Sequence, residues 1–107
     1  MAYDEQLAER VRAALPPGLA SERKMFGGIA FMVQGNMCCG VLGEDLIARL
    51  GERGESAVQE PHVRPFDFTG KPMRHIVFVA PEGVASDDDL QRFVDEALEF
   101  ALSLPPK

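Results

Sequence analysis

Apolar side chains recur at helical spacing near the start of the chain. One face of the implied helix consists of Leu7, Val11, Ala14 and Leu15. Asp4 stands just before this face, where its carboxylate can accept hydrogen bonds from the first N–H groups of a helix. The run Pro16-Pro17-Gly18 then ends the pattern, because proline cannot continue helical hydrogen bonding. We predict an amphipathic helix over residues 4–15.

The middle of the chain alternates apolar runs with short breaks of glycine, asparagine and aspartate. Three runs rich in β-forming residues lie near residues 25–34, 37–42 and 46–50, and the breaks between them have the composition of hairpin turns. In the first run, both alternating sets of side chains are at least partly apolar. We therefore predict three consecutive antiparallel strands, the first of which is central in the sheet or faces a partner.

A second hairpin is expected within residues 63–81. Its turn is predicted at Thr69-Gly70-Lys71, and its two prolines, Pro65 and Pro72, are restricted to strand starts, edges or bulges. The residues between the two hairpins, 51–62, are polar and predict a loop or one short helix.

The most regular pattern lies near the C-terminus. Ser86 is a suitable N-cap, and the three aspartates 87–89 would occupy the first turn, where the helix dipole favours negative charge. The apolar stripe that follows consists of Leu90, Phe93, Val94, Ala97, Leu98, Ala101 and Leu102. This stripe predicts a long helix that packs on the sheet.

These elements predict one α+β domain over residues 1–107. The expected order is a helix, three strands, a loop or short helix, two strands and a final helix. The sheet is then antiparallel, has about five strands, and is covered on one face by the N- and C-terminal helices.

The charge of the chain limits the partners that we expect. The net charge is −6, which repels polyphosphates and disfavours direct binding to nucleic acid. The two ends of the chain carry the excess of acids, whereas residues 23–81 hold seven basic and six acidic side chains. No apolar run approaches the ~20 residues of a membrane span, and the charged N-terminus does not resemble a signal peptide. We expect a cytoplasmic protein that does not bind a membrane.

Cys38 and Cys39 are adjacent, and neighbouring positions on a strand point to opposite faces of a sheet. Zinc sites use spacings such as Cys-x-x-Cys, which let both sulfurs converge, so we predict no metal site. Each cysteine is expected to be a buried, small apolar side chain. The alternative is that the more exposed of the two acts as a redox-sensing thiol, which requires an accessible thiolate.

The sequence contains no recognised catalytic constellation. His75 has no serine motif such as Gly-x-Ser-x-Gly to act with, and the chain has neither a P-loop nor a dinucleotide-binding glycine pattern. We predict a non-enzymatic protein without a cofactor. A different kind of site remains open, namely a basic groove on the sheet formed by Arg64, Arg74 and His75, with Cys38 or Cys39 beside it.

Several segments together resemble the TfoX N-terminal domain family. They are "KMFGGIAFMVQGNMCCGV", "DLIARLG", "PFDFTGKPM" and "VFVAPEGVASDDDLQRFVDEALEFALSLPP", spread from about Arg23 to Pro106. The most specific is Lys24-Met25-Phe26-Gly27-Gly28. The resemblance implies an α+β fold similar to that of secretion-chaperone-like proteins, a relation to the TfoX/Sxy regulators of bacterial competence genes, and no established catalytic residues. We expect a member without the helical C-terminal domain of the named regulators.

The family motif has a structural interpretation that needs no ligand. Gly27 and Gly28 would allow a bulge or a close approach of two backbones at the start of the first strand. Met25 and Phe26 would then enter the core.

Two functions follow from these observations. The leading one is a small regulatory or adaptor domain that binds a protein partner, or a second copy of itself as in a homodimer, through a face or edge of the sheet. The alternative is a domain that binds a small ligand or anion in the groove of Arg64, Arg74 and His75.

Overall fold

The strands of the computed structural model form one antiparallel sheet. The structure describes residues 3–25, 27–67, 70 and 73–106, except for the side chains of Met73 and Arg74. Within these residues the sheet has six strands in the order β1-β2-β3-β4-β6-β5. The strands are β1 (Ala20–Met25), β2 (Gly28–Val33), β3 (Asn36–Leu42), β4 (Asp45–Arg49), β5 (Val63–Phe66) and β6 (Met73–Val79). The helices are α1 (Glu5–Ala14), α2 (Arg53–Ala57), the 3-10 helix η1 (Pro81–Val84) and α3 (Asp87–Ser103).

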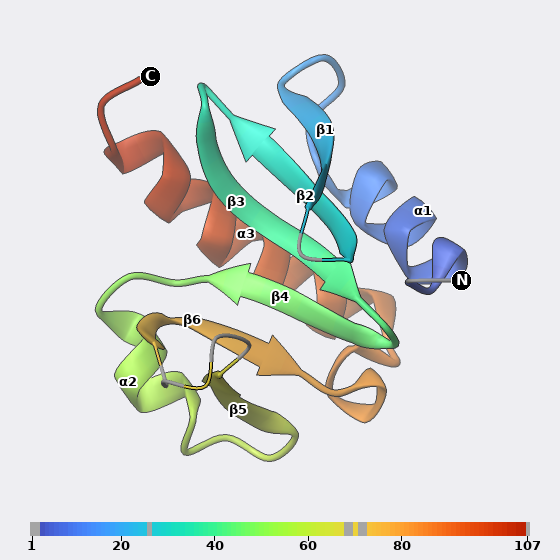
Figure 1. The fold of residues 1–107 in the computed structure, drawn as a ribbon. Coiled ribbons are helices and arrows are strands. Elements are labelled where there is room, and N and C mark those ends of the chain that lie inside the picture. Colours follow the sequence, from blue (N-terminus) through green and yellow to red (C-terminus); the bar gives the residue numbers. More distant parts are fainter. Residues whose placement is uncertain (1–2, 26, 68–69, 71–72, 107) are drawn as a thin grey trace.

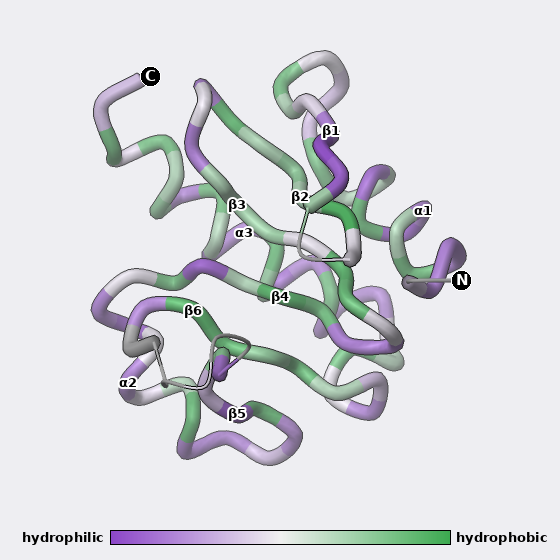
Figure 2. Tube along the Cα trace, in the orientation of Figure 1, coloured by the Kyte–Doolittle hydropathy of each residue, from purple (hydrophilic) through white to green (hydrophobic). Residues whose placement is uncertain are grey.

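Helices α1 and α3 cover one face of the sheet, and α3 passes behind β3 and β4 in Figure 1. The core lies between these two layers. Its largest fully buried side chains include Val11, Phe31, Leu46, Val77 and Phe93. Figure 2 shows that β2, β3 and β4 consist largely of hydrophobic residues, whereas β1 is hydrophilic. The predicted α+β fold with terminal helices on one face of an antiparallel sheet is confirmed.

Both terminal helices begin at the predicted N-caps. The Asp4 carboxylate accepts hydrogen bonds from the backbone N–H groups of Gln6 at 2.9 Å and Leu7 at 3.2 Å. The Ser86 hydroxyl accepts one from the N–H of Asp89 at 3.1 Å. These bonds satisfy N–H groups that have no partner within the helix. Of the apolar stripe of α3, Leu90, Phe93, Val94, Ala97 and Ala101 are buried, Leu98 is partly buried, and the side chain of Leu102 is 45% exposed.

Strand β1 is the main departure from the predicted fold. The strand expected near residues 25–34 corresponds to β2, and the additional strand β1 precedes it, so the described sheet has six strands where about five were predicted. Five of the six residues of β1 are exposed, because β1 lies at the edge of the sheet and pairs only with β2 among the described strands. Charged side chains are common on edge strands, where they discourage pairing with other chains. The polar sequence of β1 therefore gave no strand signal.

The second hairpin and the short helix agree with the sequence. β5 and β6 are antiparallel neighbours, and α2 precedes them as a single short helix. Of the predicted turn residues Thr69, Gly70 and Lys71, the first and third lie outside the described residues.

Candidate functional site

One set of alternating strand residues faces away from α1 and α3. In β2, for example, Phe31 belongs to the core beneath the helices, so its neighbour Met32 points to the opposite side. We call this second side of the sheet the open face. Its apolar residues among those described are Met25, Ala30, Met32, Met37, Leu42, Ile47, Phe66, Ile76 and Phe78.

A β-bulge at Cys38 decides which residues of β3 reach the open face. Phe31 pairs with Cys39 and Met32 pairs with Met37, which leaves Cys38 as an additional residue between the two pairs. As a result, Cys38 and Cys39 both belong to the core beneath the helices, and Met37 lies on the open face. The prediction that the two cysteines point to opposite faces is therefore wrong.

The two thiols lie together in the core. Both side chains are 0% exposed, which confirms the prediction that each cysteine is buried. The pKa of the Cys39 thiol is raised well above its ordinary value. The larger cause is a hydrogen bond with Cys38, and the next is burial of the thiol. A buried, protonated thiol is a poor nucleophile. The candidate redox thiols thus lie inside the folded domain, and neither is exposed.

The open face carries an apolar surface that is only partly buried. We call this surface the open-face patch, and it consists of Met25, Met32, Met37, Leu42 and Ile76. Three of its residues, Met37, Leu42 and Ile76, pack against a second small core of Ile47, Phe66 and Phe78, in which the two phenylalanine ring centres are 4.8 Å apart. Methionine has a flexible and polarisable side chain, which suits surfaces that must adapt to a binding partner.

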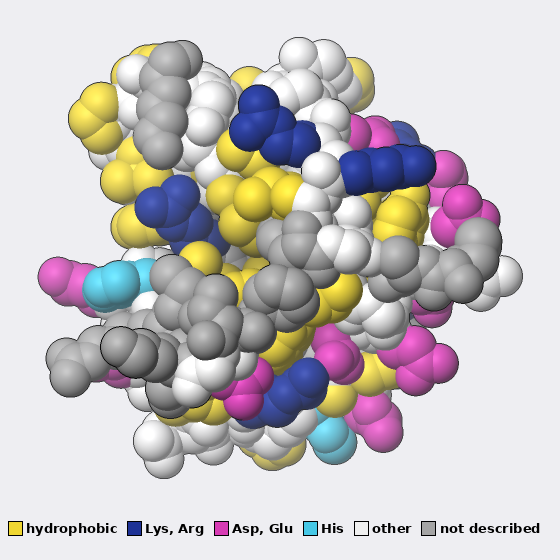
Figure 3. All heavy atoms as spheres, in the orientation of Figure 1, with side chains coloured by type: hydrophobic (Ala, Val, Ile, Leu, Met, Phe, Trp, Pro, Cys, Tyr) yellow, Lys and Arg dark blue, Asp and Glu magenta, His cyan; other side chains and the backbone are white. Residues whose placement is uncertain are grey.

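Arginine side chains lie on the same side of the sheet as the open-face patch. Arg23 is exposed and lies opposite Ala30 across the β1–β2 pair. The Arg49 guanidinium lies 5.5 Å from the ring centre of Phe100 and donates a long hydrogen bond of 3.5 Å to the carbonyl oxygen of Met37. Figure 3 shows apolar side chains on this face between side chains of lysine and arginine. The open face therefore combines apolar area with positive charge.

The structure does not bring the predicted groove residues together. Arg64 lies on the open face, where its guanidinium is 4.5 Å from the ring centre of Phe78 and forms an ion pair of 2.7 Å with Asp45. His75 alternates with Ile76 and shares the side of Val77, which belongs to the core beneath the helices. Arg64 and His75 thus point to opposite sides of the sheet.

The third predicted groove residue is Arg74. Its backbone belongs to β6, but its side chain lies outside the described residues.

The family motif Lys24–Gly28 forms the connection between β1 and β2. Gly27 has a positive φ of 80°, as a tight turn requires, and a Cβ atom at Gly28 would lie closer than 3.0 Å to the carbonyl oxygen of Val41. The predicted close approach of two backbones is therefore confirmed. Met25 does not enter the core, because its side chain is 37% exposed on the open face. Phe26 lies outside the described residues.

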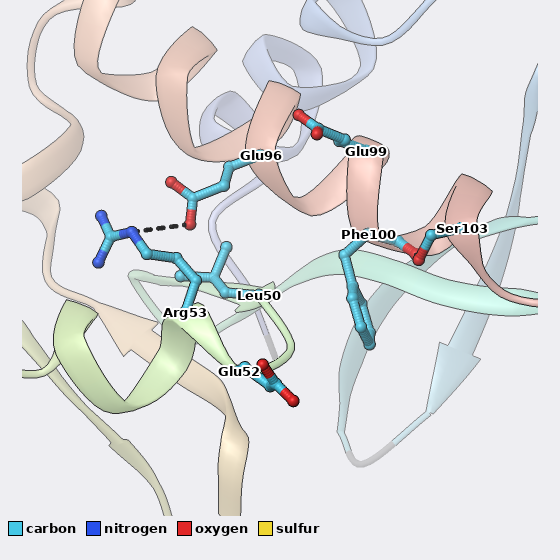
Figure 4. Close-up of a pocket in the computed structure, with 7 residues that line it drawn as sticks. All are labelled: Leu50, Glu52, Arg53, Glu96, Glu99, Phe100 and Ser103. Atoms are coloured by element: carbon cyan, nitrogen blue, oxygen red, sulfur yellow. Dashed lines mark hydrogen bonds and ion pairs between the residues drawn. The ribbon is translucent and has the colours of Figure 1, made fainter.

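A cleft of about 510 Å³ lies where α3 passes the β4–α2 connection. Figure 4 shows Arg53 and Glu96 on opposite walls, with 3.3 Å between Arg53 Nε and Glu96 Oε2, and Phe100 at one end. The lining residues are Leu50, Glu52, Arg53, Glu96, Glu99, Phe100 and Ser103. Three carboxylates and one guanidinium line this cleft, so its charge is opposite to that of the anion site that the sequence suggested.

Among the described residues, no three or more His, Cys, Asp or Glu side chains are grouped so that they could hold a metal ion. In the same part of the chain, every helix is too short or too polar to cross a membrane.

Sequence reasoning identified parts of the open face but not the face itself. It noted apolar residues on both sides of β2, seven basic side chains within residues 23–81, and Arg64 as part of a basic groove. It missed Met37 as a surface residue, because the bulge at Cys38 reverses the alternation of β3. Adjacent cysteines carry no signal for a bulge, so only the strand pairing shows it.

The comparisons with known proteins identify a family. The model of the TfoX N-terminal domain matches residues 5–101 of the chain. No curated protein and no solved structure matched in the corresponding searches. The family match spans nearly every element of the fold, from α1 to the last turn of α3. The chain therefore belongs to the TfoX N-terminal domain family.

Proposed function

We propose that this domain is a non-catalytic regulatory or adaptor domain that binds a protein through the open face of its sheet. The observation that carries the proposal is the open-face patch, where the partly exposed apolar side chains lie on the side away from α1 and α3. Apolar area of this kind on a folded domain favours association with another protein. Membership of a family related to competence regulators agrees with a regulatory role.

The edges of the sheet are less suited to binding than its open face. An added strand would have to align with β1 or β5, the two edge strands of the described sheet. β1 presents the charged run Glu22-Arg23-Lys24, and β5 contains Pro65, which has no N–H group to donate. Both features oppose pairing with another chain, which leaves the open face as the better docking surface.

Binding of a small anion has less support. Arg64 is already paired with Asp45, and His75 lies on the other side of the sheet. The cleft beside Phe100 is lined by carboxylates. Each of these features makes a shared anion site on the sheet unfavourable, so we keep protein binding as the single proposed function.

Site-specific cross-linking in the native cells tests the proposal. A photo-reactive amino acid would replace Met32 in the open-face patch, and a matched variant would carry it at Asp88, an exposed position of α3 on the helix side. We expect a discrete protein adduct, with another protein or a second copy, at position 32 and not at position 88. No adduct at position 32, or the same adducts at both positions, would show that the open face is not the binding surface.

A further inference from the structure

Exposed acidic side chains are numerous in the helix layer of the domain. The exposed acids of the helix layer are Glu5, Glu9, Asp87, Asp88, Asp89, Asp95 and Glu99. Among the described strand residues, the charged side chains that the register places on the open face are Arg23, Arg49, Arg64 and Asp45, whose carboxylate is paired with Arg64. In a protein with a net charge of −6, the described strand residues of this face thus carry three arginines and one carboxylate.

Two of the arginines on this face have no acidic partner among the described residues. Arg23 takes part in no ion pair there, and Arg49 contacts only the Met37 carbonyl oxygen and the Phe100 ring. An arginine side chain has five N–H donors, so most of the donors of both residues remain available. A guanidinium beside apolar area binds a carboxylate more favourably than one in open water, because the local dielectric constant is lower.

The described residues of this face are poorly suited to nucleic acid. Single strands are bound by aromatic rings on which bases stack. The described aromatic residues of the open face, Phe66 and Phe78, are only 6% and 5% exposed. Met37, Leu42 and Ile76 pack against the cluster of these rings and Arg64 lies over Phe78, so neither ring offers a stacking surface. The combination of methionine side chains and available guanidinium groups fits an acidic peptide better than a phosphate backbone.

We propose that the segment that docks on the open-face patch is acidic and amphipathic, with apolar side chains that cover Met32 and Met37 and carboxylates that pair with Arg23 and Arg49. This inference rests on the proposed function, because it names the partner chemistry of the same surface. The charge complementarity would give specificity and a fast association rate, whereas the apolar contacts would supply most of the affinity.

The test is a selection from a random peptide library displayed on phage, with the full chain as bait. Binding of each selected peptide is then followed by NMR of the protein labelled with ¹³C at its methionine methyl groups, three of which report on the open-face patch. We expect the enriched peptides to be rich in Asp, Glu and large apolar residues, to shift the signals of Met32 and Met37, and to bind more weakly as salt is added.

Matched variants distinguish a loss of positive charge on the open face from a general loss of stability. The double variant Arg23→Gln/Arg49→Gln should weaken binding of the acidic peptides by at least about tenfold, or ~1.4 kcal/mol. The control Arg92→Gln removes one positive charge on the helix side and should leave binding unchanged, since Arg92 pairs there with Glu60. Both variants are first compared with the wild type in thermal unfolding.

The outcomes distinguish the two proposals. Neutral or basic peptides that shift Met32 and Met37 would overturn the acidic partner and leave protein binding by the open face intact. Methionine shifts that depend on protein concentration alone would show that a second copy of the chain occupies the open-face patch. Shifts caused by an added DNA oligonucleotide would show that nucleic acid occupies it. Either result would overturn the proposal of an acidic peptide partner. Selected peptides that leave both methionine signals unmoved would overturn both proposals.

Discussion

Gly28 of β2 lies directly against the backbone of Val41 in β3. A Cβ atom at position 28 would come closer than 3.0 Å to the Val41 carbonyl oxygen, a distance that real Cβ atoms essentially never show. The contact is between backbones, so no side-chain rotation can relieve it. The last glycine of the family motif Lys24–Gly28 therefore has a structural role, which is to let β2 and β3 approach at this point.

Replacing Gly28 by alanine should force β2 and β3 apart. We expect Gly28→Ala to lower the free energy of unfolding by ~1–3 kcal/mol, the usual cost of placing extra atoms in a packed site. Hydrogen exchange of the β2 and β3 amides should accelerate at the same time. Gly18→Ala is the control, because no atom lies within 4 Å of the added Cβ at that loop position. Unchanged amide exchange in Gly28→Ala would contradict the explanation.

The raised pKa of Cys39 predicts a loss of stability in alkaline solution. The folded state holds the thiol proton more tightly than the unfolded state, because Cys38 bonds to the thiol and burial disfavours the thiolate. The resulting stabilisation is complete below the unfolded pKa of ~8.5 and is lost as the pH rises towards the folded value. Urea denaturation over a range of pH should show this decrease in the free energy of unfolding.

Two variants identify the group responsible. Cys39→Ala should lower stability at neutral pH but flatten the alkaline decrease, since the titrating thiol is gone. Val41→Ala removes a buried apolar side chain from the same strand and should keep the full pH dependence. Equal slopes for the two variants would show that another group causes the decrease. Thiol reagents should modify neither cysteine of the wild type until it unfolds, because both are 0% exposed.

Asn36 of β3 binds the segment after α3 through a side-chain hydrogen bond. Its side chain is only 3% exposed, and its Nδ2 donates a hydrogen bond of 3.0 Å to the carbonyl oxygen of Pro105. We expect Asn36→Asp to lower the free energy of unfolding by ~1–3 kcal/mol, because an aspartate of nearly the same shape cannot donate this bond and its charge is buried. Limited proteolysis should also release the residues after α3 more quickly. Resistance equal to that of the wild type would contradict this role.

Local signals made much of the fold predictable. The helical spacing of Leu7 and Val11 and the cap residue Asp4 specify α1 within a few residues, because cap and stripe report on neighbouring positions. β1 lacked such a signal. Its side chains Glu22 and Lys24 are exposed, so no burial pattern reveals the strand, and only its pairing with β2 defines it.

The open face was predictable only in part, and for a related reason. Alternation in β2 correctly placed Phe31 and Met32 on opposite sides. In β3 the bulge at Cys38 shifts the alternation by one residue, which places both cysteines in the core and Met37 on the surface. A bulge depends on how two distant segments pair, so it leaves little trace in either segment alone.

The carboxylate of Glu60 joins α2 to α3 and predicts a loss of stability in acid. It accepts a hydrogen bond of 2.6 Å from Arg53 and one of 3.0 Å from Arg92, and these bonds, that of Arg53 most strongly, lower its pKa. A lowered folded pKa gives stability that is present above the unfolded pKa of ~4.3 and is lost as the pH falls through the folded value. Glu60→Gln should therefore be less stable than the wild type at neutral pH, by up to ~1 kcal/mol for each partly exposed pair. The difference in the free energy of unfolding between Glu60→Gln and the wild type should shrink in acid and in high salt, as measured by urea denaturation. The control is Glu44→Gln, at an exposed turn without an ion pair among the described residues, which should be as stable as the wild type under all these conditions. A Glu60→Gln deficit that persists unchanged in acid would show that side-chain packing, rather than charge, holds α2 against α3.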